Sequence, residues 1–406
     1  MSPSRKAIPI ILGALLFSIF ALSGCIARKR SRSRAKRNLS AREPTVEELK
    51  RARAARKFLH TNRPLFRNRH LARLCALRGL RDLDLSNTAV NSRGLRCLLL
   101  MRRLEYLNLS GTKIDDAAFV TLSELKHLAI LNVSKTAVSG WKFDLLPRMT
   151  RLERLNISGN RIALQTLNYL GGAPSLKRLS ARNMAGPVSL DFLRSTKLTH
   201  LDISGSSIGG SQLLHLATAK QLVGLNVSHI PIDKGVARAI GQLKNLQELY
   251  AAQCSIQSSF AQYFFQSSHL RVLDLYGNGV RGEVLNHLAK TPRLQRLTLS
   301  GSSFIKKDIL AQKVWFSRAI FRGLPMARIP WPKTMRVLEL PLSDMDDKNL
   351  GFLKMLPELK VLDLRQTLVT QAKIRELQTQ YPGLKLSWIP LLAGTLFIHR
   401  QVTPTF

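Results

Sequence analysis

The sequence predicts an α/β fold built as one solenoid, a curved horseshoe with a parallel sheet on its concave side and short helices on its convex side. Three observations lead to this prediction: leucines recur at a nearly fixed interval, a short alternating segment follows each of them, and helical spacing fills the intervals. The composition agrees, because 45% hydrophobic and 22% charged residues exclude a wholly disordered chain. The 406 residues are therefore expected to form mainly one array.

Each unit of the array opens with a Leu-x-x-Leu or, once, a Met-x-x-Leu segment. Consecutive openings lie 24 residues apart, except for an interval of 22 before Leu198 and one of 41 before Met335. Twelve units are therefore predicted, over residues 80–304 and 335–386. They open at Leu80, Leu104, Leu128, Leu152, Leu176, Leu198, Leu222, Leu246, Leu270, Leu294, Met335 and Leu359.

The clearest unit runs from Leu80 to Val90 and follows the pattern LxxLxLxxTxV. This pattern resembles the leucine-rich repeat family, and the resemblance spans residues 71–386. One repeat alone cannot bury enough apolar surface, but stacked copies bury a continuous leucine ladder and leave a curved sheet facing solvent. The resemblance implies a scaffold that recognises a partner without catalysis.

Physical chemistry assigns each position of the unit a direction. Leucines at the fourth and sixth positions alternate as a strand requires, so they point into the core while the fifth position points outward. The ninth position takes small polar residues that can bond turn backbones inside the stack, and Cys254 occupies that position. The other ninth-position residues are Thr88, Thr112, Thr136, Asn160, Ser206, Asn278, Ser302, Ser343 and Thr367.

The N-terminus has the order of a secretion signal. Arg5 and Lys6 precede an uncharged run over residues 7–27, which ends in Leu22-Ser23-Gly24-Cys25. This tetrad resembles the lipobox of bacterial lipoproteins, so residues 1–24 are predicted to be a cleaved signal peptide and Cys25 the acylated mature N-terminus. The protein is then expected at a bacterial cell envelope, anchored to a membrane by lipid.

An alternative is an uncleaved membrane helix over residues 7–27, because 21 uncharged and mainly apolar residues suffice to span a bilayer. Seven cations follow this run and two precede it, so the positive-inside rule favours an inner-membrane anchor with a cytoplasmic domain. Residues 25–44 read as a basic flexible tether. Residues 28–37 could instead be an import signal of a secreted effector scaffold that acts in host cells.

Two caps and an insertion complete the predicted organisation. Residues 45–79 are expected to form an N-terminal helical cap, with a helix from Thr45 to about Leu59, and residues 387–406 a C-terminal cap that closes the last core. The 41-residue interval contains 41 − 24 = 17 extra residues, and they are expected within an aromatic and basic insertion over 305–334. There Trp315, Phe316 and Trp331 either form an exposed contact surface for a partner or pack over a divergent repeat.

The sequence argues against catalysis and against a bound metal or cofactor. It contains no HExxH motif, Walker loop or spaced Cys/His cluster, so we expect no enzymatic activity, no cofactor and no metal. The GxGxxG match over residues 277–282 falls in register with the repeat, which explains it without a nucleotide. Cys75 and Cys97 lie in neighbouring convex segments but differ in phase by two positions, so buried thiols are expected rather than a disulfide.

A protein or peptide partner is expected on the concave sheet. The fifth-position row is polar and mildly acidic, which disfavours nucleic acid despite a net charge of 63 − 25 = +38. Aromatic and polar side chains that could anchor a partner are Tyr106, His200, Asp202, Tyr250 and Tyr276.

Cations recur one or two residues before the opening leucines and are expected to align along one rim. They either bind a polyanion, such as anionic lipid or polysaccharide, or stabilise the C-terminal ends of convex helices through the helix dipole. A polyanion or membrane-surface binder is thus the main alternative to a protein-binding scaffold. The rim comprises Arg78, Arg102, Arg103, Lys126, Arg151, Lys197, Lys220, Lys244 and Arg293.

Overall fold

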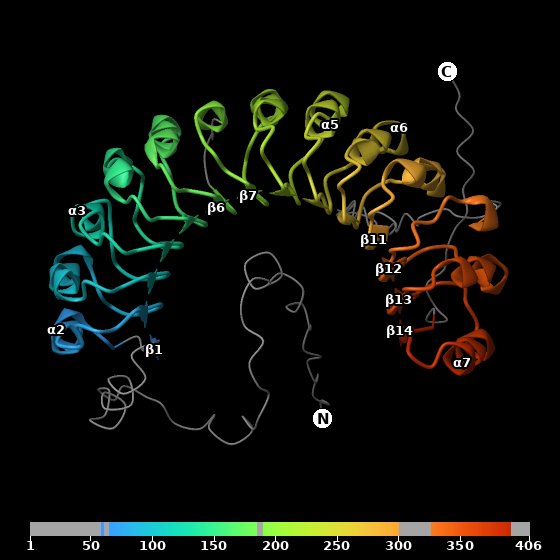
Figure 1. Cartoon of the computed structure of the whole chain (residues 1–406), viewed down its shortest axis with the longest axis horizontal. Helices are drawn as coiled ribbons and strands as arrows, with labels where there is room; N and C mark the ends of the chain where they lie inside the picture. Colours follow the sequence, from blue (N-terminus) through green and yellow to red (C-terminus); the bar gives the residue numbers. More distant parts are fainter. Residues whose placement is uncertain (1–57, 61–64, 185–189, 300–325, 391–406) are drawn as a thin grey trace, which may run out of the picture. The chain divides into compact units, whose positions relative to one another are not determined.

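The computed structural model describes residues 58–60, 65–184, 190–299 and 326–390. These residues form a solenoid whose strands lie on the concave side and whose helices lie on the convex side (Figure 1). The fold class predicted from the periodicity is confirmed. The proposed signal peptide, Cys25 and the tether over 25–44 lie outside the described residues, as do Trp315 and Phe316.

Fourteen parallel strands, hydrogen-bonded in chain order, make up the described sheet. Each predicted unit supplies one strand, from β2 to β13, because every strand is centred on the fourth-position leucine. The strands are β1 (Phe58–His60), β2 (Asp82–Asp84), β3 (Tyr106–Asn108), β4 (Ile130–Asn132), β5 (Arg154–Asn156), β6 (Arg178–Ser180), β7 (His200–Asp202), β8 (Gly224–Asn226), β9 (Glu248–Tyr250), β10 (Val272–Leu275), β11 (Arg296–Leu299), β12 (Val337–Glu339), β13 (Val361–Asp363) and β14 (Lys385–Ser387).

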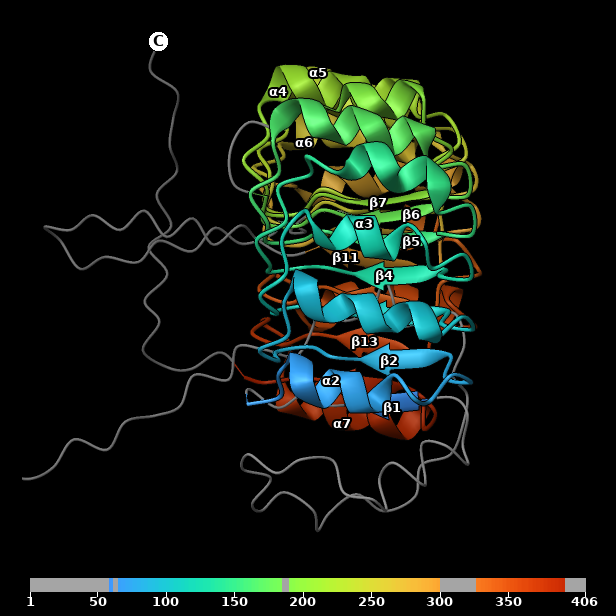
Figure 2. The ribbon, with the colours of Figure 1, turned by 90° about the vertical axis from the view of Figure 1, so that its left-hand side faces the viewer.

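Short α- and 3₁₀-helices cover the convex side, stacked beside one another along the array (Figure 2). The α-helices are α2 (Asn68–Leu74), α3 (Ala118–Leu122), α4 (Gly210–Leu213), α5 (Lys234–Gly241), α6 (Ser258–Ala261) and α7 (Gln371–Gln380); the 3₁₀-helices are η1 (Ser92–Leu100), η2 (Phe143–Arg148), η3 (Leu164–Gly172), η4 (Asp191–Arg194), η5 (Leu214–Thr218), η6 (Gln262–Gln266), η7 (Gly282–Lys290), η8 (Met326–Arg328) and η9 (Asp347–Met355).

The core between sheet and helices is a ladder of leucines in register. Leu83 faces Leu107, which faces Leu131, and all three side chains are almost fully buried. Phe119 and Phe143 meet edge to face under the helices, with ring centroids 5.1 Å apart. Truncating one such ladder leucine to alanine is expected to cost about 2–5 kcal/mol of stability.

Ninth-position side chains bond turn backbones inside the stack, as predicted. Thr88 donates to the Leu85 carbonyl in its own unit, at 2.7 Å. Asn278 is fully buried and reaches the preceding unit, donating to the Ala251 carbonyl at 2.7 Å and accepting from the Cys254 amide at 2.8 Å. The residue in the GxGxxG match is therefore a structural bridge between neighbouring units.

The N-terminal end differs from the expected helical cap. The helix predicted to reach about Leu59 does not extend that far, because Phe58–His60 is strand β1 and pairs in register with β2. At the other end, β14 adds one strand after the last predicted unit opening at Leu359, and the Trp388 indole donates to the Val369 carbonyl at 3.1 Å. Most of the predicted C-terminal cap, residues 391–406, lies outside the described residues.

The long interval does not disturb the sheet, since Leu297 on β11 pairs with Leu338 on β12 across 41 residues. Trp331, a candidate for partner contact, is instead 7% exposed and stacks on Phe352 with ring centroids 4.5 Å apart. Its indole N–H donates to the Met326 carbonyl at 2.9 Å. The alternative of packing over a divergent repeat is therefore correct for Trp331.

The prediction of free thiols at Cys75 and Cys97 was wrong, because the two form a disulfide. Cys75 is the C-cap of α2 and Cys97 lies in η1, and their Cα atoms are 5.7 Å apart. Strand hydrogen bonds fix the register of the concave side alone. An α-helix and a 3₁₀-helix rise by different amounts per residue, so a two-position offset in sequence still places the sulfurs together.

Candidate functional site

The fifth-position row, predicted to face a partner, is largely committed to the fold. Asp202 is 4% exposed, and its Oδ1 accepts hydrogen bonds from the Ser204 amide at 3.1 Å and the Ser204 hydroxyl at 2.7 Å. These bonds form Asx turns that terminate the strands. The same acceptor bond to the amide two residues later occurs at Asp84, Asn108, Asn132, Asn156, Asn226, Asp274 and Asp363.

Asp202 is therefore a turn residue in the first place, and its contact with a partner stays a prediction. Burial raises the pKa of Asp202, while the hydrogen bonds from Ser204 and the positive charge of Arg182 act in the opposite direction. The Nε atom of Arg182 lies 3.9 Å from the Oδ2 atom of Asp202. The polar and acidic character of the fifth-position row is thus explained by strand endings.

The third-position row is where the units differ chemically. These side chains alternate with the buried fourth-position leucines, so they lie on the concave face of the sheet. The row takes no part in the Asx turns and its members include aromatic, cationic, acidic and apolar side chains. In strand order from β2 to β13 it reads Asp82, Tyr106, Ile130, Arg154, Arg178, His200, Gly224, Glu248, Val272, Arg296, Val337 and Val361.

The centre of this row carries three basic side chains on adjacent strands. Arg154 pairs in register with Arg178, and Arg178 with His200. Burial, then Arg178 and Arg154, lower the pKa of His200 to about 4, so its imidazole is neutral at pH 7. Burial and the charge of Arg154 also lower the pKa of Arg178.

A glycine and an acidic side chain follow this basic cluster along the row. Gly224 on β8 leaves room for the neighbouring imidazole, because a Cβ there would lie 2.6 Å from Cδ2 of His200. Glu248 on β9 is half-buried; burial raises its pKa, and Arg178 and Arg271 lower it. The row therefore changes from basic to acidic across Gly224.

The predicted tyrosines lie on the concave sheet and are partly buried there. Burial, followed by the charges of Asp84 and Asp82, raises the pKa of Tyr106. Burial, followed by Glu248, raises the pKa of Tyr250 to about 12. Tyr276 lies farther along, at the seventh position of the β10 unit.

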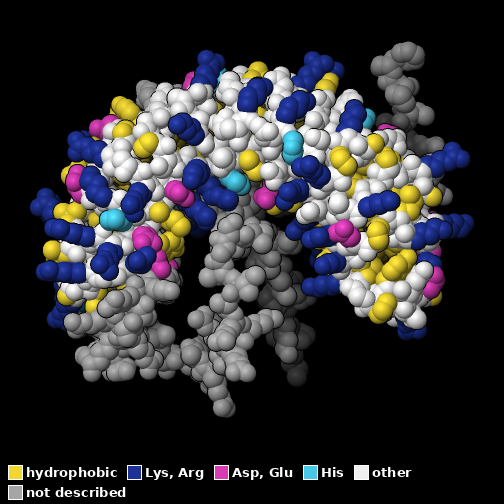
Figure 3. Space-filling view, viewed as in Figure 1, with side chains coloured by type: hydrophobic (Ala, Val, Ile, Leu, Met, Phe, Trp, Pro, Cys, Tyr) yellow, Lys and Arg dark blue, Asp and Glu magenta, His cyan; other side chains and the backbone are white. Residues whose placement is uncertain are grey.

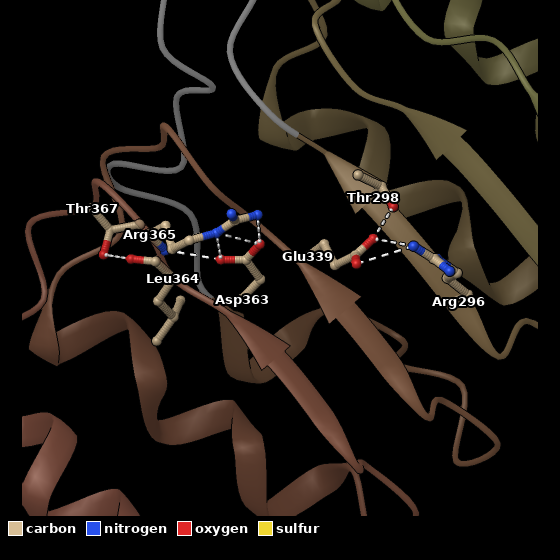
Figure 4. A network of polar contacts seen from close by, with 7 residues as sticks. All are labelled: Arg296, Thr298, Glu339, Asp363, Leu364, Arg365 and Thr367. Atoms are coloured by element: carbon tan, nitrogen blue, oxygen red, sulfur yellow. Dashed lines mark hydrogen bonds and ion pairs between the residues drawn. The ribbon is translucent and has the colours of Figure 1, made fainter. Parts of the chain in front are cut away.

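Farther along the same sheet, charges are paired (Figure 4). Arg296 donates through one nitrogen to both Glu339 oxygens, at 3.0 and 2.9 Å, and Thr298 donates to Glu339 at 2.6 Å. Arg365 donates to both oxygens of Asp363 through Nε and Nη2. Sequence reasoning missed both pairs and the Arg154–Arg178 row. Glu339 and Asp363 belong to the fifth-position row, but the arginines lie at the third and seventh positions of their units.

All nine residues of the predicted basic rim are exposed, and two of them bond helix ends. Lys126 donates to the Ser123 carbonyl at 3.1 Å, at the C-cap of α3. Lys244 donates to the Gly241 carbonyl at 3.2 Å, at the end of α5. The helix-end explanation fits these two lysines. In Figure 3, Lys and Arg side chains are spread along the whole array on the face in view, without one dominant patch.

Neither a metal-binding cluster nor a membrane-spanning helix is found among the described residues. Within residues 58–60, 65–184, 190–299 and 326–390, no group of three His, Cys, Asp or Glu side chains is placed to hold a metal ion. No helix in these ranges combines the length and apolar character needed to cross a membrane.

Comparison with known proteins agrees with this architecture. Residues 194–211 match a family model described as Leucine Rich repeat. The match runs from the end of η4 into α4 and includes β7, which pairs in register with strands of the same length on both sides. The fold is a leucine-rich repeat solenoid. Proteins with this fold are generally binding scaffolds rather than enzymes.

Two solved structures resemble the leucine-rich repeat solenoid at 16% identity. One is an internalin from Listeria monocytogenes, with a TM-score of 0.45 and a match that covers 77% of this chain and 82% of the internalin. The other is a leucine-rich repeat protein from Leptospira interrogans, with a TM-score of 0.49 and coverage of 85% and 98%. None of the curated proteins compared with the chain matches it.

Proposed function

We propose that this chain is a lipid-anchored binding protein of a bacterial cell envelope, which holds a protein partner on its concave sheet without catalysing a reaction. The observation that carries the proposal is the third-position row. Turn bonds explain most of the fifth- and ninth-position side chains, but the fold makes no such use of Arg154, Arg178, His200 and Glu248. Chemically varied side chains on a regular concave surface are what recognition of one partner requires.

The disulfide between Cys75 and Cys97 supports an exported location. Disulfides persist in oxidising compartments and are rare in the bacterial cytoplasm. It therefore favours the lipoprotein over a cytoplasmic domain behind an uncleaved helix. Acylated Cys25 and the cationic tether supply the two signals that stable attachment to a membrane generally requires.

Mass spectrometry of the protein purified from membranes tests the anchor. The expected result is an N-terminal peptide that begins at an acylated Cys25, together with a linked Cys75–Cys97 peptide under non-reducing conditions. An intact Met1 terminus with reduced cysteines would contradict export. It would support the inner-membrane alternative.

Site-specific photo-crosslinking in cells that produce the full chain tests the binding surface. A photoreactive phenylalanine analogue replaces Tyr250 on the concave sheet or, as the matched control, Tyr169 in η3, which is 47% exposed. We expect one discrete crosslinked protein at position 250 that persists at high salt, and none at position 169. Crosslinks at position 102 in place of 250, lost at moderate salt, would instead favour the polyanion or membrane-surface alternative.

A further inference from the structure

Two arginines at the centre of the concave sheet make neither a side-chain hydrogen bond nor an ion pair with the described residues. Arg154 and Arg178 occupy facing positions on β5 and β6, which lie about 4.8 Å apart as neighbouring strands do. Neither guanidinium group donates a hydrogen bond or forms an ion pair with a described residue. Each is half-buried, so the sheet confines two like charges in a small space.

Three other arginines on or beside the strands of the concave sheet are paired with carboxylates. The distance from a guanidinium nitrogen to a carboxylate oxygen is 2.9 Å for Arg81 and Glu105 and 2.9 Å for Arg296 and Glu339. It is 2.6 Å for Arg365 and Asp363. A carboxylate from a partner that reached Arg154 and Arg178 would form the same kind of arginine–carboxylate pair there. Arginine groups bind carboxylates through charge-assisted hydrogen bonds, which are roughly twice as strong as neutral ones.

His200 completes the basic cluster on the side of Gly224. Its Nδ1 lies 3.0 Å from the hydroxyl of Thr199, and its ring leans over the glycine. With a carboxylate nearby, protonation of the imidazole would become more favourable, and the ring would add a third donor. The cluster therefore gains charge complementarity from an anion and loses none of the bonds that hold the fold.

We infer that Arg154, Arg178 and His200 form an anion-binding subsite that receives the carboxylate side chains of an acidic segment of the partner protein. This inference rests on the proposed function, because it assigns chemistry to the partner of the concave sheet.

Acidic neighbours favour such a segment over a polymer of uniform negative charge. Glu153 pairs with Lys177 at 3.2 Å, Asp202 lies beside Arg182, and Glu248 follows across Gly224. These carboxylates flank the basic cluster and would repel a long polyanion. A protein segment can place one or two carboxylates over the arginines and neutral or basic residues over the flanks.

Binding of a fluorescent hexaglutamate peptide to the full-length chain in detergent tests the subsite. We expect Arg154→Gln/Arg178→Gln to weaken binding by about tenfold or more, as removal of charge-assisted bonds does. The matched control, Arg102→Gln/Arg103→Gln, removes the same charge from the exposed rim and is expected to change affinity by less than about twofold. Equal weakening by both variants would overturn the inference.

A heparin oligosaccharide in the same assay distinguishes the class of anion. We expect its binding to depend on the rim arginines rather than on the central pair. Tighter binding of heparin than of hexaglutamate through Arg154 and Arg178 would overturn the assignment to a protein segment. If hexaglutamate binding does not need the pair while the crosslink at position 250 persists, the inference fails and the proposed function stands.

Thermal unfolding shows whether the arginines have a merely structural role. Because the change removes like-charge repulsion, Arg154→Gln/Arg178→Gln is expected to leave the Tm unchanged or to raise it. In NMR titrations, added hexaglutamate is expected to raise the pKa of His200 in the wild-type chain and not in this variant. A Tm several degrees lower, or no effect of the peptide on His200, would overturn the inference.

Discussion

An arginine at the same repeat position is unpaired at the centre of the concave sheet and paired with a carboxylate in its C-terminal part. Arg154 on β5 and Arg296 on β11 occupy the same position of the unit. Arg296 donates to Glu339 on the next strand, whereas the equivalent position beside Arg154 is Ser180, whose hydroxyl bonds that of Ser158. A repeat position therefore does not determine function. The neighbour one strand away decides whether an arginine is part of the scaffold or free to bind.

Removing the scaffold carboxylate should have the largest effect. Glu339→Ala leaves Arg296 and Thr298 without their acceptor, and a loss of about 1–3 kcal/mol in the free energy of unfolding is expected. The matched control is Glu358→Ala, since the Glu358–Arg336 side chains are 47% and 51% exposed and such pairs contribute about 0–1 kcal/mol. Urea unfolding and hydrogen exchange at β11–β13 measure both. Equal losses of unfolding free energy in the two variants would show that the Arg296–Glu339 pair stabilises the fold no more than the exposed Arg336–Glu358 pair.

Introducing a carboxylate beside Arg154 should pair this arginine as Arg296 is paired, and so remove the difference between the two regions. Ser180→Glu places an acid beside Arg154 at the position that Glu339 takes beside Arg296. We expect hexaglutamate affinity to fall by about tenfold, because the guanidinium then has an internal partner. Asn108→Glu adds the same charge on β3, away from the central arginines, and should change affinity little. An unchanged affinity in Ser180→Glu would show that the two positions are not equivalent.

The smallest effect concerns acid stability. The pKa of His200 is lowered to about 4 from 6.5, so the unfolded chain takes up this proton at higher pH than the folded chain. The stability that His200 contributes is present above about pH 6.5 and is lost as the pH falls towards 4. His200→Gln should therefore lose less stability between pH 7 and pH 4 than the wild type. Thermal unfolding across this range measures it, and parallel curves for both proteins would show that burial does not act on His200.

The periodic features of the fold followed from the sequence because each is a local requirement repeated many times. Leucines at the fourth and sixth positions placed β2–β13, and small polar residues at the ninth position indicated the buried bonds of Thr88 and Asn278. The first strand was missed because its unit begins at Arg56 rather than at a leucine. The opening leucine that marks most of the units is therefore absent there.

Features that depend on contacts between units were not accessible in the same way. The disulfide depends on the register of α2 against η1, which strand spacing does not fix. Asn or Asp at the fifth position looked like a solvent-facing surface, although a bond to the amide two residues later also selects these residues. The candidate subsite required knowing which side chains lie one strand away from Arg154 and which of them provide an acceptor.

The disulfide also determines how the array responds to mechanical load. Tension applied from the N-terminal side of β1 reaches Cys75 and passes through the sulfur bridge directly to Cys97. Once β1 has separated from β2, the residues between the two cysteines, including β2, form a closed loop that the chain tension bypasses. A tethered chain that holds a partner under force would thus have its second strand shielded from peeling, and the next point of mechanical failure lies beyond Cys97.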